Sequence, residues 1–353
     1  MTARDAMTSL ERVLTTLGHS EPDRVPFFLL NNLHGAKEMG LEPREYFRDP
    51  DLVARGQLGL REKYRDDCLY SFFYAAIEMY PWGGEVNYSP DGPPTAAEPV
   101  IHRRNIPSLE VPDVESNPDL RRVLDATESM KKGIGDEAPI IGVVMSPFSL
   151  PVMQMGFAEY LSLIYEYPEE FWSLMRVNRE FCVRWANAQL KAGATAICYF
   201  DPVSSPTIIP EELYGKTGLA IGKSTLGRIE GPTATHLASG IALPIMPRLP
   251  ETGTAAVGVG DSEDLRSLKA SSLGRISLLG NLNGIKMVNW DHRQAEEAVV
   301  EAIDAAAAGG GFILSDNHGE LPLQVPEDAM MAISEAVHEH GRYGIAPGEG
   351  KDG

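Results

Sequence analysis

The feature that most constrains the fold of this chain is a repeated alternation of short apolar runs with long amphipathic stretches. The runs that we interpret as strands are Val25–Leu30, Cys68–Phe73, Ile140–Met145, Ala196–Asp201, Ala234–Ser239, Ala255–Gly260, Ile276–Gly280 and Gly311–Ser315. The stretches with helical character include Phe157–Ala192, Glu211–Thr225, Ser262–Ser271 and Arg293–Ala308. Buried strands that alternate with helices are typical of parallel βαβ units. Because there are eight runs, we predict an α/β fold of the closed (β/α)₈ TIM-barrel type rather than an open sheet.

One long stretch after the second strand interrupts this alternation. Residues 81–118 are rich in Pro and Gly and contain a short alternating run at Pro99–Arg104. We predict that this excursion forms a loop or hairpin over the barrel mouth, because long loops are often lids or docking elements. A surface loop without a role would explain it equally well. The remainder of residues 1–346 is predicted to be a single barrel domain, followed by a disordered tail at 347–353.

Composition and charge exclude several classes of function. The formal net charge is −19, which argues against a nucleic-acid groove and against binding to an anionic membrane surface, since both need clustered Lys and Arg. Three widely spaced cysteines, Cys68, Cys182 and Cys198, form no CxxC pair and indicate a reducing compartment. We find no signal-peptide pattern near the N-terminus and no apolar run of the roughly 18 residues that a membrane span needs. We therefore expect a cytoplasmic protein that does not bind a membrane.

Polar residues gather where the predicted strands end. His34 follows the first strand, His236 lies in the fifth and His318 follows the last. A single histidine in an apolar context is usually structural, but the carboxyl ends of barrel strands form the active site in this fold. Asp201 ends the fourth strand, where it could orient an imidazole, act as a general acid or bind a metal, or could simply cap the following turn.

Other well-known catalytic motifs are absent. The chain has no GxGxxG that opens a βα unit, no phosphate-binding GxxxxGK[ST], no HExxH and no GxSxG. No cysteine lies at a predicted turn beside a histidine. The histidines and Asp201 are therefore the main candidates for chemistry.

Several stretches, taken together and in chain order, resemble the uroporphyrinogen decarboxylase superfamily. They cover nearly the whole chain and comprise the opening SLERVL at 9–14 with PDRVP at 22–26, SPFSL at 146–150, AGA at 192–194 leading to DP at 201–202, PE at 210–211, LGNL at 279–282, and GGFILS at 310–315 with later prolines and acidic residues at 322–328. The resemblance implies a TIM barrel with its active site at the carboxyl ends of the strands.

The decarboxylase branch of this superfamily carries an RQAGRY segment whose arginines hold the substrate carboxylates. The corresponding segment here is LNNLHG at 30–35, which has no arginine. A substrate with many carboxylates would lack its main bidentate partners. Decarboxylation remains the alternative, because His318-Gly319 resembles the decarboxylase's GHG.

The other branch consists of corrinoid-dependent methyltransferases. Its thiol-methylating members bind zinc through an HxC motif and a later cysteine. In this chain His236 matches the histidine, Ala238 replaces the first cysteine, and His318 falls near the second. A rebuilt zinc site would have to use His236, His318 and either Asp201 or Glu320.

The loss of the zinc-binding cysteines disfavours methylation of a thiol and favours the opposite half-reaction. The resemblance then implies transfer of a methyl group from a small methylated donor, best an aryl methyl ether, to Co(I) of a corrinoid. The chain has no DxHxxG cobalamin motif, so the corrinoid would come from a partner protein or in free form. A barrel that only binds a corrinoid or tetrapyrrole is a further alternative, and a homo-oligomer is left open.

For this reaction the predicted catalytic residues are His236, Asp201 and His318, which would protonate or stabilise the departing phenolate. The predicted substrate-binding residues are Asn31, Asn32, His34, Phe72, Phe148, Asn281 and Glu320, with Phe73 as further pocket wall.

Overall fold

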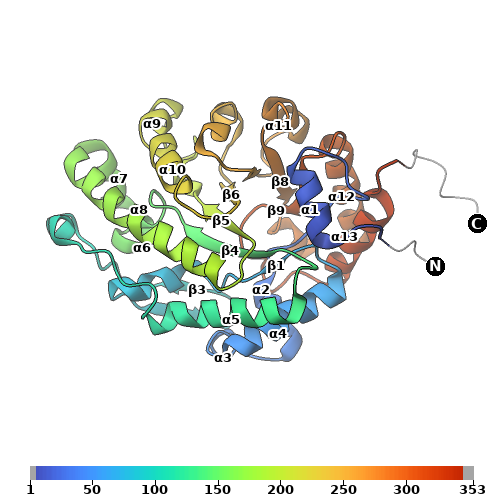
Figure 1. Cartoon of the computed structure of the whole chain (residues 1–353), viewed down its shortest axis with the longest axis horizontal. Helices are drawn as coiled ribbons and strands as arrows, with labels where there is room; N and C mark the ends of the chain where they lie inside the picture. The colour runs from blue at the N-terminus through green and yellow to red at the C-terminus, as the bar shows by residue number, and fades with distance from the viewer. Residues whose placement is uncertain (1–4, 345–353) are drawn as a thin grey trace, which may run out of the picture.

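A curled parallel sheet surrounded by helices forms the centre of the molecule in the computed structural model, which describes residues 5–344 (Figure 1). The seven strands are hydrogen-bonded in the order β1-β4-β5-β6-β7-β8-β9, and each neighbouring pair is parallel. Their bounds are β1 Leu69–Tyr70, β4 Ile140–Met145, β5 Ala196–Phe200, β6 Thr233–His236, β7 Ala256–Gly258, β8 Ser277–Leu282 and β9 Phe312–Asp316. The predicted α/β barrel is confirmed.

The first predicted strand, Val25–Leu30, is not a regular strand, but it closes the barrel. Leu314 of β9 donates its N–H to Pro26 O (2.9 Å), and Asp67, just before β1, donates its N–H to Phe27 O (2.8 Å). The segment therefore joins the two edges of the seven-stranded sheet.

Carboxylates explain why this segment does not form a regular ladder. The backbone N–H groups of Phe27, Leu29 and Leu30 donate to side chains instead of to a neighbouring strand, and Pro26 has no N–H to donate. The acceptors are Asp67 Oδ2 (2.9 Å), Asp66 Oδ1 (3.3 Å) and Asp316 Oδ1 (2.8 Å). The prediction of eight regular strands is thus wrong by one.

Helices cover the outside of the sheet (Figure 1). The predicted helical stretch Phe157–Ala192 is two helices, α7 and α8, because Pro168 cannot donate the backbone hydrogen bond that would continue the first. The α-helices are α1 Ser9–Leu17, α2 Asn32–Met39, α3 Pro43–Tyr46, α4 Pro50–Tyr64, α5 Pro118–Ile134, α6 Pro151–Met155, α7 Phe157–Glu166, α8 Pro168–Lys191, α9 Glu211–Lys216, α10 Gly218–Leu226, α11 Leu265–Ser272, α12 His292–Ala306 and α13 Glu327–His340. Short 3₁₀ helices are η1 Ala75–Trp82, η2 Arg103–Ser108, η3 Pro202–Ser204, η4 Leu243–Ile245, η5 Leu249–Thr252 and η6 Lys286–Asn289.

Helix α1 lies across the N-terminal end of the barrel. Leu10 donates its N–H to Glu137 O (3.0 Å), and Thr16 O accepts the N–H of Gly311 (3.2 Å). Its leucines line the barrel interior from below. The opposite end, where the strands terminate, is the mouth.

The excursion at residues 81–118 contains a hairpin. Strands β2 Val86–Ser89 and β3 Gly92–Ala96 pair antiparallel around a turn at Pro90 and Asp91. The alternating run at Pro99–Arg104 forms no strand and instead leads into η2. The predicted disordered tail lies outside the described residues. No described helix is both long and apolar enough to cross a membrane.

Candidate active site

A pocket of about 340 Å³ opens at the barrel mouth. Side chains from the segment after β1, the β2–β3 hairpin, β4, β5 and the loop after β9 form its walls. We call it the mouth pocket, and its lining residues are Tyr70, Phe72, Phe73, Tyr74, Ala75, Ala76, Pro93, Pro94, Thr95, Ala96, Val143, Met153, Phe200, His318, Gly319 and Glu320.

The walls of the mouth pocket are mostly aromatic and apolar. Phe72, which the sequence predicted, lies in the wall and packs near Tyr70, with ring centroids 5.5 Å apart. Phe200 forms another part of the wall. Among the described residues that line this pocket, none is Lys or Arg. The pocket is therefore suited to a small molecule with an apolar body and little negative charge.

Glu320 is the acidic group of this pocket. Its Oε1 accepts the backbone N–H of Leu33 (2.6 Å), whereas its Oε2 is buried without a hydrogen-bond partner. Burial raises the pKa of Glu320 well above its usual range, and the nearby Asp316 raises it further. Burial thus favours the neutral, protonated form of this carboxyl group.

Asp316, at the end of β9, is a second buried carboxyl beside the pocket. Its Oδ1 accepts the N–H of Leu30 (2.8 Å), and its Oδ2 has no partner. Burial raises the pKa of Asp316 to about 7, although the hydrogen bond from Leu30 acts in the opposite direction.

His318 lies at the pocket wall and is partly exposed. Burial lowers the pKa of its imidazole, Asp261 opposes this shift, and Lys286 adds to it. The ring is therefore mostly neutral at pH 7. The structure places this predicted catalytic residue in the same pocket as Glu320.

His236 is fully buried beneath the mouth pocket rather than in its wall. Its ring stacks on Phe200, with centroids 5.4 Å apart and planes inclined by 22°. Nδ1 accepts the N–H of Ala238 (3.0 Å), so the proton of the neutral ring is on Nε2, which has no partner. Burial and the nearby His318 lower the pKa of His236 to about 4.

The structure does not bring Asp201 to the two histidines. Its carboxylate accepts hydrogen bonds from the hydroxyls of Ser146, Ser149 and Ser204. Burial raises the pKa of Asp201 to about 6, although the three serines lower it. Asp201 does not line the mouth pocket. Its position corresponds to the turn-stabilising alternative, and we leave it out of the proposed catalytic set.

Two other predicted substrate-binding residues also lie away from the pocket. Phe148 is completely buried and packs edge-on against Tyr160 and Phe171, with centroids 5.9 Å apart in both cases. Asn281 lies at the end of β8, where its side-chain amide donates to Gly260 O (3.4 Å). The structure therefore does not support a role for Phe148 or Asn281 as pocket wall.

The residues after the first barrel segment support the pocket without lining it. Asn32 donates from Nδ2 to Phe72 O and accepts the hydroxyl of Tyr46 at Oδ1 (3.1 Å). Asn31 donates to Asp66 Oδ2 (3.4 Å). His34 is fully buried in α2 with both ring nitrogens unpartnered, and burial lowers its pKa to about 3.

The charges that act on His34 are those of Lys37 and Lys63, on α2 and α4. Its electrostatic surroundings are therefore those of the helices outside the barrel. We accordingly do not include His34 in the proposed catalytic set.

The zinc site that the resemblance raised does not fit this arrangement. Within residues 5–344, no three His, Cys, Asp or Glu side chains lie close enough together to hold a metal ion. Asp201 is engaged by serines, and Glu320 by Leu33. We therefore derive no step through a bound metal.

Sequence reasoning missed Tyr70 and Phe200 as pocket residues and Asp316 as a partner of the site. Successive residues of a strand point to opposite sides of the sheet. In β5 the interior residues are Cys198 and Phe200, so the next residue, Asp201, points outward. This alternation was available in the sequence and would have identified Phe200 in place of Asp201.

Comparisons with known proteins agree with the fold. A family model described as "Uroporphyrinogen decarboxylase (URO-D)" matches residues 8–340. The uroporphyrinogen decarboxylase of Xylella fastidiosa (strain Temecula1 / ATCC 700964) is 25% identical over 371 aligned positions, which cover 95% of this chain and 100% of that protein. That of Geobacter sp. (strain M21) is 28% identical over 283 positions, 78% of this chain and 80% of that protein.

Solved structures show the same fold. A methyltransferase from Methanosarcina mazei matches with a TM-score of 0.81 and 19% identity, covering 94% of this chain and 99% of that one. A B12-independent methionine synthase from Shewanella sp. W3-18-1 matches with a TM-score of 0.53 and 12% identity, covering 85% of this chain and 90% of that one. Because the family model matches almost the whole chain, this protein belongs to the uroporphyrinogen decarboxylase family.

Proposed function

We propose that this protein transfers a methyl group from a small aryl methyl ether to a corrinoid supplied by a partner protein or in free form. The observation that carries this proposal is the mouth pocket, whose walls are aromatic and which contains a carboxyl group able to hold a proton. The M. mazei methyltransferase shares the fold, which makes methyl transfer a chemistry that this architecture can host.

The pocket favours an uncharged aromatic donor over a polycarboxylate. Phe72 and Phe200 offer ring faces and edges to an arene. A substrate with many carboxylates needs arginine or lysine partners, and the described lining has none. A volume of about 340 Å³ is at the small end of ligand pockets. The corrinoid itself would therefore stay outside the pocket, at the mouth.

Demethylation of an aryl ether leaves a phenolate, which needs a proton. When bound at the mouth, the corrinoid supplies Co(I), which accepts the methyl group. Glu320 is the proton donor in this proposal, because its Oε2 is unpartnered and its carboxyl lines the pocket. The hydrogen bond from Leu33 to Oε1 fixes the carboxyl group so that Oε2 carries the proton.

The two histidines have supporting roles. His318 lies in the pocket wall as a mostly neutral ring that can hydrogen-bond the ether or the departing oxygen. His236 stacks under Phe200 and holds that ring in the wall. His236 is thus a positioning residue in this proposal and does not touch the donor.

Decarboxylation of a porphyrinogen is the second candidate. The curated relatives in the comparison are named uroporphyrinogen decarboxylases, and His318 and Gly319, which resemble that enzyme's GHG, lie in the pocket wall. The absence of a cationic partner among the described wall residues counts against this candidate.

The experiment mixes the purified protein with a chemically reduced corrinoid, free or on a carrier protein, and a panel of methoxylated aromatics and methylamines. Absorbance of the corrinoid reports its methylation. Methylation with the aromatic ethers alone is the expected result. No methylation with any donor, together with loss of carboxylates from uroporphyrinogen in a parallel assay, would establish the decarboxylase instead.

A further inference from the structure

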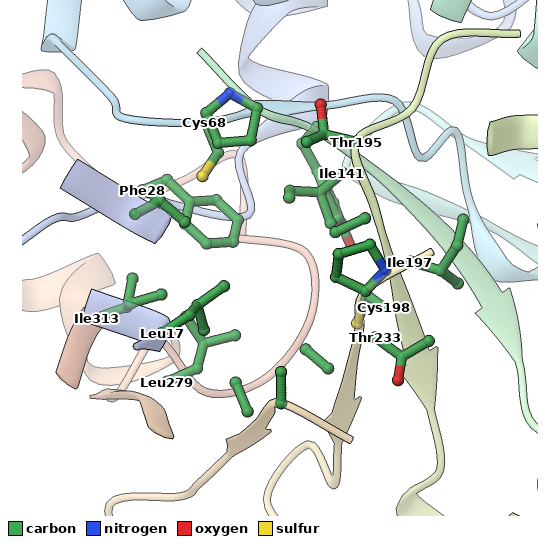
Figure 2. A pocket seen from close by; sticks show the side chains of 18 of the residues that line it. Leu17, Phe28, Cys68, Ile141, Thr195, Ile197, Cys198, Thr233, Leu279 and Ile313 are labelled. Atoms are coloured by element: carbon green, nitrogen blue, oxygen red, sulfur yellow. The ribbon is translucent and has the colours of Figure 1, made fainter. Parts of the chain in front are cut away.

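A second cavity lies at the opposite end of the barrel. It has a volume of about 70 Å³ and is bounded by α1 and the N-terminal parts of the barrel strands (Figure 2). We call it the bottom cavity. Among the described residues, Tyr70 is the one side chain that borders both the bottom cavity and the mouth pocket. The two spaces adjoin, because Phe200 in the wall of the mouth pocket stacks on His236, which borders the bottom cavity.

Small side chains create the bottom cavity. The interior of a (β/α)₈ barrel is normally filled with layers of large branched residues. Here Ala196, Ala234, Ala255 and Ala256 line the interior from β5, β6 and the start of β7. Because these side chains end at Cβ, they leave space that their neighbours do not fill.

The surface of the bottom cavity consists of apolar atoms. Leu17, Phe28, Leu279 and Ile313, from four segments of the chain, lie on one side of the space (Figure 2). Ile141, Cys198 and Thr233 lie on the other side.

No polar atom of the described residues is exposed at the surface of the bottom cavity, although His236, whose buried Nε2 has no partner, borders the cavity. The hydroxyl of Thr195 accepts the N–H of Ile140 (3.1 Å). Cavities of this kind stay free of water and accept apolar guests.

We propose that the bottom cavity binds a small apolar molecule, a hydrocarbon ring or short alkyl chain without hydrogen-bonding groups. Its volume of about 70 Å³ is about half that of an engineered cavity of roughly 150 Å³ that binds benzene or xenon. Leu14 of α1 borders the cavity and is 51% exposed. The bottom cavity therefore lies close to the molecular surface at α1.

Xenon and benzene are the probes, and methyl NMR of the full chain is the measurement. Saturable shifts are expected at the methyl groups of Leu17, Ile141 and Ile313, which border the bottom cavity. The methyl groups of Val143 and Met153, which border the mouth pocket, report separately on any benzene that enters that aromatic-lined pocket. Shifts confined to Val143 and Met153, or no saturable shift at all, would overturn the proposal.

Two substitutions of opposite effect test the position of the guest. Ala234→Leu fills the cavity and is expected to weaken xenon binding at least tenfold. Ala158→Leu, on the exposed side of α7, is the matched control and is expected to bind xenon like the wild type. Leu17→Ala enlarges the cavity and is expected to bind benzene several-fold more tightly.

The enlarging variant keeps the test decisive if Ala234→Leu does not fold. Benzene affinity unchanged by Leu17→Ala would then count against the proposal. The readout needs neither a methyl donor nor a corrinoid, so it is independent of the proposed methyl transfer.

Discussion

The two ends of the barrel differ in how their buried polar groups are satisfied. At the N-terminal end, Arg12 and Arg24 hold the buried Asp67 between them, with N–O distances of 2.7 Å for each pair. At the mouth, Asp316 and Glu320 each leave one carboxyl oxygen without a partner. Asp67 is thus paired with two cations, whereas Asp316 and Glu320 are each hydrogen-bonded through one oxygen.

This difference separates stability from chemistry. A buried carboxylate with two guanidinium partners keeps its charge, and accordingly Arg24 and Arg12 hold the pKa of Asp67 below its usual value despite burial. Unpaired carboxyls have raised pKa values and can exchange protons near neutral pH, which general acids require. In barrel enzymes the N-terminal face serves stability and the mouth serves catalysis, and the roles that we propose for Asp67 and Glu320 follow that division.

The largest effect on stability is expected from removing the carboxylate of Asp67 at the N-terminal end. Asp67→Asn removes the buried carboxylate that Arg12 and Arg24 share, although Arg12 keeps Asp23 and Arg24 keeps Asp5 as partners. The substitution should lower the free energy of unfolding by about 3 kcal/mol in urea titrations. Because the folded pKa of Asp67 is depressed, its stabilisation is present above the unfolded value of about 3.9 and is lost as pH falls through the folded value. The difference between the two proteins should therefore shrink in acid.

The matched control for Asp67 is an exposed ion pair. Asp136→Asn removes a surface partner of Lys131 and should leave stability almost unchanged, because exposed pairs contribute little. Equal losses from Asp67→Asn and Asp136→Asn would contradict the assignment of the N-terminal end to stability.

The next effect belongs to the mouth. Glu320→Gln keeps an oxygen that accepts the N–H of Leu33 but removes the acidic carboxyl proton. It should lower kcat for aryl ethers by about 100-fold, near the lower end of the range for loss of a general acid. The loss should be greatest for ethers of weakly acidic phenols and small for nitro-substituted ones, whose phenolates leave without a proton. A uniform loss across leaving groups would show that Glu320 has only a structural role. Glu297→Gln, exposed on α12, should change nothing.

Much of this comparison follows from the sequence. The βα rhythm predicts the barrel, and the polar residues after strands mark the mouth, where His318 and Glu320 lie. Strand alternation also separates the inward Phe200 from the outward Asp201. These are local patterns with a fixed period, which a sequence displays directly.

Other features depend on contacts between distant segments. The pairing of Asp67 with Arg12 and Arg24, and the lack of a partner at Asp316 Oδ2, depend on how loops at either end meet. Phe148 is another example, because a phenylalanine after a strand is equally compatible with a pocket wall and with the core formed by α7 and α8. Residue type and spacing do not decide such cases.

A smaller effect on stability, with opposite sign, is expected from replacing the carboxyl group of Asp316 by a neutral amide. The pKa of Asp316 is raised to about 7 in the folded protein, so its contribution to stability is full below the unfolded value of about 3.9 and is lost as pH rises through about 7. Asp316→Asn should therefore be more stable than the wild type at pH 8. The difference of about three pKa units between the folded and unfolded protein corresponds to about 4 kcal/mol, and the weaker hydrogen bond from Leu30 to an amide oxygen reduces the expected gain to about 2 kcal/mol. At pH 4 the advantage should disappear. An advantage that is the same at both pH values would exclude titration of Asp316 as its cause.

The smallest effect is expected at the bottom cavity, and it tests whether the N-terminal end is fully packed. Ala234→Val adds two methyl groups beside a cavity of about 70 Å³ and should raise the free energy of unfolding by about 1 kcal/mol in urea titrations, because filling a void restores lost contacts. Ala234→Ser is the control, because serine is nearly as small as alanine. It should lower the free energy of unfolding by about 1 kcal/mol, because its hydroxyl would be buried among apolar atoms. Stabilisation by valine would show that the bottom cavity lowers the stability of the wild-type protein, in agreement with a cavity that binds a ligand. Destabilisation by both variants would instead show that the strands around Ala234 are already fully packed.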